Sequence, residues 1–378
     1  MKNSEIHILH TTISPCDNER RIFNEAFTAI SHGYQVEIVA LKTPDLPEES
    51  ETDQLKIIRL SVKHWEGGPL KFLSFNWKLF RYLLKKKSAI IHVHDLWVLP
   101  ASAAASLFTG GRLIYDAHEY FAGLEIFNIK KWSGRIWILA ERMLIGKVDS
   151  LITINRFHQK LFLKLYPDIP DSAVIMNVPS LQHGPKTENM RSFDERDNCL
   201  LYQGIFKEGR SLPVLIRSMH LVWEGRLDLI GFGDLEKRLR EMVAEEGLEN
   251  KIYFRGRAGW QTILEETQRA RAGLVLFEPT SVNYTFASPN KFFEYVMAGT
   301  PVIASDIPAF RELNSIFEVG ILVRLDGPEA ISRAMKVMLT DRESWQKFHE
   351  NCLDARKVWN WEKQEDMLMD IYRKLGLI

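Results

Sequence analysis

The feature that most constrains the fold is an alternation of short β-branched runs with longer amphipathic patterns, which continues along most of this 378-residue chain. In the first half we expect strands at residues 6–9, 36–41, 56–60, 89–94, 112–118, 150–154 and 174–178. Between the first two runs, the segment Glu19–Gly33 carries apolar residues at helical spacing and ends at a glycine, which favours a helix C-cap. Strand, helix, strand is the pattern of a parallel α/β sheet.

A second alternating series begins after the polar, aperiodic stretch SLQHGPKTENMRSFDERDN, and its strands are expected in CLLYQGIF, LDLIGFG, KIYFRG, GLVLFEP, PVIAS and ILVRL. The sequence therefore predicts two Rossmann-like, doubly wound parallel-sheet domains that face a cleft, followed by a helical tail. The predicted boundaries are an N-terminal domain at 1–180, a linker at 181–197, a C-terminal domain at 198–355 and the tail at 356–378. The N-terminal domain is a candidate packing partner for this tail.

Composition excludes several classes of protein. A hydrophobic content of 46% and a charged content of 26% are those of an ordinary globular protein. Lys plus Arg equals Asp plus Glu at 49 each, so no overall field favours nucleic acid, and we expect no nucleic-acid partner. The cysteines Cys16, Cys199 and Cys352 lie far apart, which argues against structural zinc and for a reducing compartment. Because no signal-peptide pattern or membrane-spanning run is present, we expect a cytoplasmic protein.

The stretch SPNKFFEYVMAGTPVIASD is the most informative motif. Ser288 is expected as a helix N-cap and Pro289 as the first helical residue, so the free N–H groups of the first turn form an anion site. Asn290, Lys291 and Glu294 then share one side of the helix. A phosphate at the helix start leaves Glu294 one turn further on, where a carboxylate can accept both hydroxyls of a ribose. The alternative is a Lys–Glu pair on a solvated face behind an ordinary cap.

This stretch resembles the donor-binding signature of the retaining glycosyltransferases of family 4, which have the GT-B fold. Other segments agree with the family in order and spacing: DNERRIFNEAFTAISHGYQVEIVA, HVHDLWVLPAS, YDAHEYF, VDSLITIN, MNVP, YQGIFKEGR and LIGFGD. The resemblance covers nearly the whole chain. It implies transfer of a sugar, with retention, from a UDP-sugar or GDP-sugar on the second domain to a saccharide or lipid-linked saccharide on the first. The expected setting is polysaccharide or cell-envelope glycan synthesis.

The resemblance also implies roles for single residues. Glu294 matches the glutamate that holds the ribose, and Arg210 matches the basic residue that contacts the phosphates as charge leaves the sugar. His118 matches the histidine that lies beside the transferred sugar. The alternatives are an exposed loop arginine and a structural strand-end histidine. The donor-binding set is Gly204, Ser288, Pro289, Asn290, Lys291 and Glu294.

The chain departs from the family pattern in the first glutamate of the Glu-x7-Glu motif. Phe286 stands at that position, so the group that the family often places against the transferred sugar is missing. Glu278 lies eight residues too early, and it can substitute only if the loop SVNYTFA folds back.

A second departure lies in YQGIF, where the family often carries an arginine after the glycine and this chain has Ile205. Arg210 and either Lys207 or Lys291 then have to supply the missing positive charge. Together the two departures keep open one alternative to the transferase, a non-catalytic nucleotide-sugar-binding protein. A second alternative is a GT-B-fold sugar-nucleotide epimerase.

We expect no metal and no other cofactor. The chain has no Asp-x-Asp pair to hold a divalent ion against a diphosphate, so Arg210, Lys291 and the helix dipole have to stabilise the leaving group. In HVHD, the residues His92, His94 and Asp95 offer a second interpretation as metal ligands. Only the two histidines point to the same side of a strand, and a third ligand is not evident.

Two stretches of the first domain combine aromatic and basic residues: LKFLSFNWKLFRYLLKKK, from Leu70 to Lys87, and IKKWSGRIWILAERMLIGK, from Ile129 to Lys147. Helices of this composition can lie on an anionic bilayer and reach a lipid-linked acceptor, which predicts a peripheral contact with the inner face of the cell membrane. The alternative is a pair of ordinary crossover helices with basic outer faces.

Overall fold

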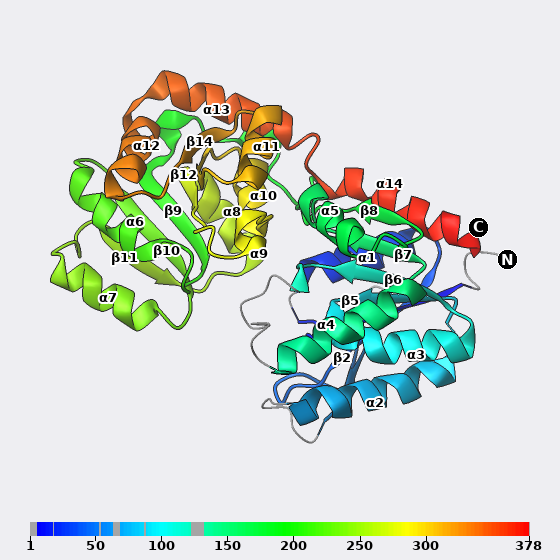
Figure 1. Ribbon diagram of the computed structural model, residues 1–378. Helices are drawn as coiled ribbons and strands as arrows, with labels where there is room; N and C mark the ends of the chain where they lie inside the picture. The colour runs from blue at the N-terminus through cyan, green and yellow to red at the C-terminus, as the bar shows by residue number, and fades with distance from the viewer. Residues whose placement is uncertain are drawn as a thin grey trace. The chain divides into compact units, whose positions relative to one another are not determined.

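The computed structural model describes residues 6–17, 19–52, 54–62, 69–86, 88–121 and 132–377 (Figure 1). The chain divides into two compact units. The first comprises Met1–Met176 and Gln364–Ile378, and the second comprises Asn177–Lys363. The stretch 181–197, expected as a linker, lies within the second unit, and the end of the expected tail lies within the first.

The first unit is built on a sheet with the strand order β3-β4-β2-β1-β5-β6-β7-β8. Every neighbouring pair is parallel except β3 and β4, which are antiparallel. The strands are β1 (His7–Thr11), β2 (Gln35–Leu41), β3 (Glu49–Thr52), β4 (Leu55–Leu60), β5 (Ile90–His94), β6 (Arg112–Ala117), β7 (Ser150–Thr153) and β8 (Ser172–Val174). The winding direction reverses beside β1, so the carboxyl ends of β1 and β5 form the place where such a sheet binds ligands.

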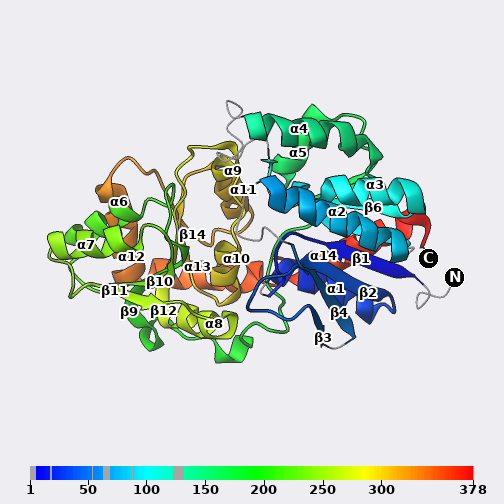
Figure 2. The ribbon, with the colours of Figure 1, turned by 90° about the horizontal axis from the view of Figure 1, so that it is seen from below.

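Helices cover both faces of this sheet. They are α1 (Arg20–Ser31), α2 (Pro69–Lys86), α3 (Leu99–Thr109), α4 (Trp132–Leu144) and α5 (Arg156–Leu165). One apolar core joins α2, α3 and α5 to the buried sides of β5, β6 and β7, and α4 packs against it; Figure 2 shows these helices on one side of the sheet and α1 on the other. Because both faces are covered, the residues of the central strands are buried nearly without interruption rather than at alternate positions.

The second unit is a wholly parallel sheet with the order β11-β10-β9-β12-β13-β14. Its strands are β9 (Asp197–Ile205), β10 (Arg226–Phe232), β11 (Ile252–Gly256), β12 (Ala270–Val275), β13 (Val302–Ser305) and β14 (Gly320–Val323). Its helices are α6 (Leu212–Ser218), α7 (Glu236–Glu245), α8 (Trp260–Arg269), α9 (Val282–Thr285), α10 (Asn290–Met297), α11 (Pro308–Ile316), α12 (Pro328–Thr340) and α13 (Arg342–Ala355). The reversal beside β9 again marks the ligand end of the sheet.

The last helix, α14 (Trp361–Tyr372), begins in the second unit and continues into the first. Within the first unit, Gln364 Oε1 accepts a hydrogen bond of 2.8 Å from the backbone N–H of Met176. At the other end of the helix, the Tyr372 ring lies edge-on to Tyr34, with 6.0 Å between ring centroids. Across the described residues, no helix combines the length and the apolar character needed to cross a bilayer.

Candidate functional site

In the second unit, the residues predicted to bind the donor lie around the start of α10. The helix begins at Asn290, and its N-cap is Pro289, whose backbone is extended (φ −77°, ψ 138°). The prediction of Ser288 as the N-cap and Pro289 as the first helical residue is therefore wrong by one position. Proline fixes φ but not ψ, so it fits the last extended residue as well as the first helical one. Among the described residues no side chain caps this helix.

Lys291 points from the first turn of α10 toward the end of β9. Its Nζ is buried, has no hydrogen-bond partner among the described residues, and lies 3.9 Å from the centroid of the Tyr202 ring. A Cβ atom on Gly204 would lie 3.2 Å from this Nζ. Burial lowers the pKa of Lys291 well below its usual value, the Arg210 charge adds to this, and Glu294 opposes it. Burial therefore disfavours the ammonium form of Lys291, and a bound anion would favour it.

Glu294 lies one turn further along α10 and is 9% exposed. It accepts a hydrogen bond from Gln203 Nε2, and the Oε1 of Gln203 in turn accepts one of 3.2 Å from Thr267 Oγ1. This chain of contacts fixes the carboxylate from β9 and α8. Because Glu294 and the Lys291 Nζ are both buried, the alternative interpretation of a pair on a solvated face does not describe them.

Arg210 lies in the loop between β9 and α6. Its guanidinium carbon is 3.7 Å from the centroid of Phe277 and 4.9 Å from that of Tyr284, so the fork stacks on aromatic faces. Glu278 Oε1 accepts hydrogen bonds from the backbone N–H (3.1 Å) and the hydroxyl (2.9 Å) of Ser211. The carboxylate that we considered as a substitute for the missing glutamate therefore holds the loop that carries Arg210.

Ile205 and Phe286, the two departures from the family pattern, lie at the end of a strand and just after a short helix. Ile205 is 50% exposed at the end of β9. Phe286 follows α9, and its backbone N–H donates to Val282 O at 3.0 Å. Neither side chain can carry a charge to the start of α10, whereas the ionisable amine of Lys291 lies there.

The glycines of LIGFGD have a packing role. A Cβ atom on Gly231 would lie 1.9 Å from Gly204 O, and one on Gly233 would lie 2.4 Å from Phe206 O. Both residues have positive φ, at 155° and 152°. The end of β10 can approach the end of β9 only because these side chains are absent.

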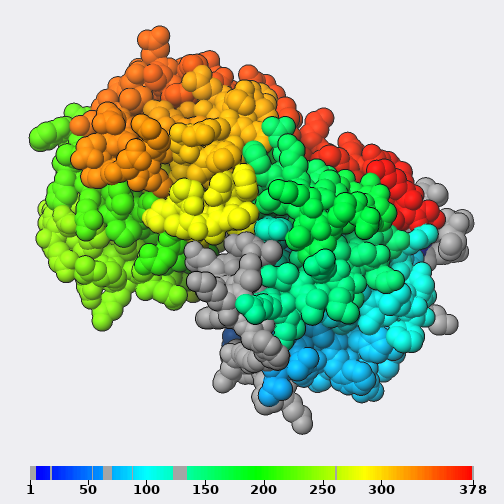
Figure 3. Space-filling view, in the orientation of Figure 1, coloured from blue at the N-terminus to red at the C-terminus, as the bar shows by residue number. Residues whose placement is uncertain are grey.

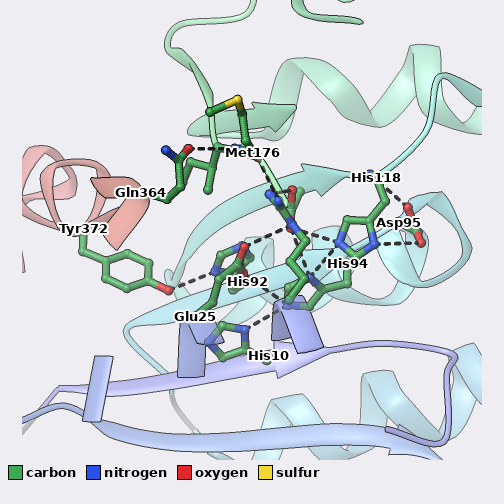
Figure 4. A network of polar contacts seen from close by, with 12 residues as sticks. His10, Glu25, His92, His94, Asp95, His118, Met176, Gln364 and Tyr372 are labelled. Carbon is green, nitrogen blue, oxygen red and sulfur yellow. Dashed lines mark hydrogen bonds and ion pairs between the residues drawn. The ribbon is translucent and has the colours of Figure 1, made fainter. Parts of the chain in front are cut away.

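In the first unit, the carboxyl ends of three strands and one face of α1 hold a group of polar side chains that we call the strand-end cluster (Figure 4). Its members are His10 of β1, Arg21 and Glu25 of α1, His92 and His94 of β5, and Asp116 and His118 at the end of β6. All are buried except His118, whose side chain is 22% exposed. The three histidines of β1 and β5 stack on one another, with ring centroids 4.7 Å to 5.2 Å apart.

His118 is the member that we predicted beside the transferred sugar. Its Nε2 donates to Asp116 Oδ2 at 3.0 Å, and its Nδ1 lies 3.6 Å from Asp95 Oδ2. Burial alone would lower the pKa of His118, but the charges of Asp95 and Asp116 outweigh it and raise the pKa to about 9. The ring is therefore an imidazolium at neutral pH, and it cannot act there as a general base.

Arg21 holds the carboxylate of Asp116, which binds the His118 ring. Its Nε and Nη2 donate to the two oxygens of Asp116, each at 2.7 Å, and its Nη1 donates to Ile175 O at 2.8 Å. Although burial opposes it, this fork together with His118 holds the pKa of Asp116 well below its usual value. Sequence reasoning did not single out Arg21, Glu25 or Asp116. The available signals were the i,i+4 spacing of Arg21 and Glu25, and the position of Asp116 two residues before His118.

A metal ion does not suit the strand-end cluster. Glu25, His92, His94 and Asp116 each bring one N or O atom within 4.8 Å of the others. However, Arg21 Nε already lies 3.2 Å from Glu25 Oε1 in addition to binding Asp116. This guanidinium supplies the positive charge that a cation would bring. Asp95, the third residue of the HVHD interpretation, turns its carboxylate to His118 instead.

Two protein-family models match successive parts of the chain. Residues 19–177 match the model described as "Glycosyltransferase Family 4", and residues 185–354 match the one described as "Glycosyl transferases group 1". A phosphatidyl-myo-inositol mannosyltransferase of Mycobacterium leprae is 23% identical over 359 residues, which cover 92% of this chain and 90% of the relative. An uncharacterized 41.2 kDa protein of the cps region of Klebsiella pneumoniae is 21% identical, over 76% of this chain and 80% of its own.

Solved structures have the same fold. Sucrose-phosphate synthase from Thermosynechococcus elongatus superposes with a TM-score of 0.76 at 18% identity, and 98% of this chain and 99% of that one are covered. Anabaena Alr3699/HepE in complex with UDP and glucose superposes with a TM-score of 0.72 at 12% identity, covering 98% and 100%. At these identities the likeness concerns the fold.

Proposed function

Because the chain belongs to the family 4 glycosyltransferases and has their GT-B fold, it is an enzyme that transfers a sugar, and we propose that its donor is a nucleoside-diphosphate sugar held by the second unit. The observation that carries this proposal is the buried Lys291 Nζ at the start of α10, one turn before Glu294. The ammonium and the helix start suit a diphosphate, and the carboxylate suits a ribose.

The phosphates have two further sources of stabilisation in the second unit. Arg210 presents its fork from the β9–α6 loop, which Glu278 holds in place through Ser211. The dipole of α10 adds a fixed positive field at the same end. We therefore propose that transfer proceeds without a metal ion and that Lys291 replaces the charge missing at Ile205. A structural relative was solved in complex with UDP and glucose, which supports a nucleotide donor, and the donor that we propose is a UDP-sugar or a GDP-sugar.

The proposed stereochemical course is retention, with the leaving phosphate deprotonating the acceptor hydroxyl. In the second unit Phe286 replaces the family's first glutamate and Glu278 is held by Ser211, so the carboxylate of this loop is committed to structure. His118 contacts the transferred sugar from the first unit in this proposal. As an imidazolium it donates hydrogen bonds and stabilises negative charge.

The proposed acceptor is a saccharide or lipid-linked saccharide reached at an anionic membrane surface. On α2, Leu70, Leu73 and Trp77 are 58%, 68% and 61% exposed, and on α4, Leu139 and Met143 are 57% and 69% exposed. Figure 3 shows both helices at the surface of the first unit. The described basic residues on them are Lys71, Lys78, Arg81, Lys85, Lys86, Arg135 and Arg142. Exposed apolar side chains beside cations suit a peripheral contact with anionic lipid. Lys87 and residues 129–131 of the two predicted stretches lie outside the described residues.

The test is a transfer assay in which UDP-hexoses and GDP-hexoses are incubated with candidate acceptors, and nucleotide release and product are both measured. We expect one donor to give a glycosylated product, Glu294→Ala to raise the donor KM, and Arg210→Ala to lower kcat. Normal kinetics in both variants would contradict the site. Tight donor binding without turnover would favour a non-catalytic binder, the alternative suggested by Phe286 and Ile205. Conversion of the donor sugar into another sugar would favour an epimerase.

A further inference from the structure

A continuous line of polar contacts runs from the C-terminal helix to His118. The Tyr372 hydroxyl lies 3.0 Å from His92 Nδ1, and His92 Nε2 lies 3.4 Å from Glu25 Oε2. One carboxylate oxygen of Glu25 lies within 4.8 Å of one of Asp116, and Arg21 Nε lies between them, 3.2 Å from Glu25 Oε1 and 2.7 Å from Asp116 Oδ2. Asp116 Oδ2 in turn accepts from His118 Nε2 at 3.0 Å. Figure 4 shows Tyr372, His92 and Glu25 in this order beside His10 and His94.

The first contact has a defined direction. Burial raises the pKa of Tyr372 well above its usual value, and burial together with the neighbouring His10 and His94 lowers the pKa of His92 well below its own. Both groups are therefore neutral at physiological pH, and a neutral phenol donates to the unprotonated nitrogen of a neutral imidazole. The Tyr372 hydroxyl thus holds the His92 proton on Nε2, the nitrogen that faces Glu25.

Glu25 lies between His92 and Asp116. Both of its oxygens are buried and accept no hydrogen bond from the described residues; the nearest cation is Arg21, at 3.2 Å. A carboxylate without donors is unfavourable in such a place, whereas a carboxylic acid brings its own donor. Burial, followed by the charge of Asp116, raises the pKa of Glu25 to about 8. At neutral pH its proton is therefore available to Asp116.

We propose that Tyr372, His92 and Glu25 are positioning residues for His118, because the positions of their protons decide whether Glu25 presents a donor to Asp116, the carboxylate that holds the His118 ring. The donors point one way: the hydroxyl to His92, His92 toward Glu25, and Glu25 to Asp116. The relevance to catalysis rests on the proposed function of His118, but the arrangement of protons can be measured without it.

Other charged and titratable groups face this line from every neighbouring element. His118 faces Asp95 after β5, Asp116 on β6 and His94 on β5. Glu25 faces Arg21 on its own helix and the two histidines of β5. His10 of β1 lies 2.9 Å from His94, through its Nδ1.

The test is Tyr372→Phe, which removes the hydroxyl and keeps the ring against Tyr34. Without that donor, His92 can move its proton to Nδ1 and accept the Glu25 proton at Nε2. Asp116 then loses a donor and holds the imidazolium more strongly. We expect the pKa of His118, followed by nitrogen NMR of histidine-labelled protein, to rise by a few tenths. In the transfer assay, kcat should fall about fivefold with the donor KM unchanged.

The matched control is Tyr34→Phe. The Tyr34 hydroxyl is also buried, but it has no hydrogen-bond partner among the described residues, and its ring lies beside Tyr372. Removing it should leave the pKa of His118 at its original value. If Tyr372→Phe also leaves that pKa unchanged, or lowers it, in protein that keeps its melting temperature, the proposal is overturned.

A second measurement concerns Glu25 itself. The carboxyl ¹³C signal of Glu25, assigned by its loss in Glu25→Gln, should titrate near pH 8, as its raised pKa requires. Titration at an ordinary carboxylate pKa would contradict the donor role. These signals are read without substrate, so they distinguish the two proposals: if His118→Asn transfers sugar normally, the role of His118 in catalysis fails while the proton arrangement stands.

Discussion

Among single residues, Lys291 is a buried amine whose protonation is opposed both by burial and by a neighbouring positive charge. Its Nζ is enclosed by Tyr202, Gly204 and the first turn of α10, and the nearby Arg210 repels it. A bound diphosphate would offset both the cost of burying the ammonium and the repulsion by Arg210, so binding and protonation of this amine favour each other.

Removal of this ammonium should weaken binding of the donor far more than it changes the fold. For Lys291→Met we expect the Kd of the nucleoside diphosphate, measured by calorimetry, to rise by about 10-fold to 100-fold, the loss of a contact to a charged group. The control is Lys237→Met, because Lys237 is 90% exposed on α7. Equal affinity in both variants would remove Lys291 from the site.

We predict that the activity falls at high pH because His118 loses its proton there. Because Asp95 and Asp116 raise its pKa to about 9, above the usual value near 6.5, the imidazolium and the stability it contributes persist at neutral pH and are lost as the pH rises through 9. We expect kcat/KM to fall over the same range.

Asp95→Asn should move that fall to lower pH, because one of the two carboxylates that favour the charged ring is gone. Asp326→Asn, an exposed position, is the control. A profile in Asp95→Asn that superposes on that of the control would show that His118 does not govern this limb.

At the scale of elements, the approach of β10 to β9 shapes the donor end of the sheet. Gly231→Ala places a Cβ atom 1.9 Å from Gly204 O. Because a backbone atom cannot move aside as a side chain can, we expect a loss of about 3 kcal/mol or more in the free energy of unfolding, measured by urea denaturation.

Gly247→Ala is the matched control for this change. Gly247 also has positive φ, at 65°, but its Cβ would meet nothing within 4 Å. It should lose only the backbone strain of about 1–2 kcal/mol. If the two variants are equally stable, the contact between the strand ends is looser than described.

The elements themselves could be predicted from the sequence to different degrees. The parallel strands follow from buried β-branched runs, and each of these runs overlaps a strand of the structure. The strand β3 was missed because ESET is polar and lies at a sheet edge, where only pairing with β4 makes it extended. The last run of the first half, expected at 174–178, overlaps β8 at Val174 alone.

The donor motif was local and could be recognised in one stretch of sequence. The strand-end cluster could not, because its contacts join residues far apart. Arg21 binds Asp116 across 95 positions, and Tyr372 meets His92 across 280. Periodicity and spacing carry no information about such pairs, which depend on the order of strands in the sheet.

At the scale of the whole molecule, the exposed faces of α2 and α4 predict membrane attachment. Trp77→Ser should reduce flotation of the protein with anionic liposomes at low salt, because an exposed aromatic side chain is lost from the basic surface. Trp223, 84% exposed in the second unit, supplies the control Trp223→Ser. Recovery of the unmodified protein only in the lipid-free fraction would refute the membrane contact.

The division of α14 between the two units has a consequence for synthesis on the ribosome. Tyr372 and Gln364 belong to the first unit, yet they are translated after the whole of the second unit. The second unit can therefore fold from a contiguous nascent segment, while the first has to wait with His92 and Met176 uncovered. The first unit is therefore completed only after the second has been synthesised.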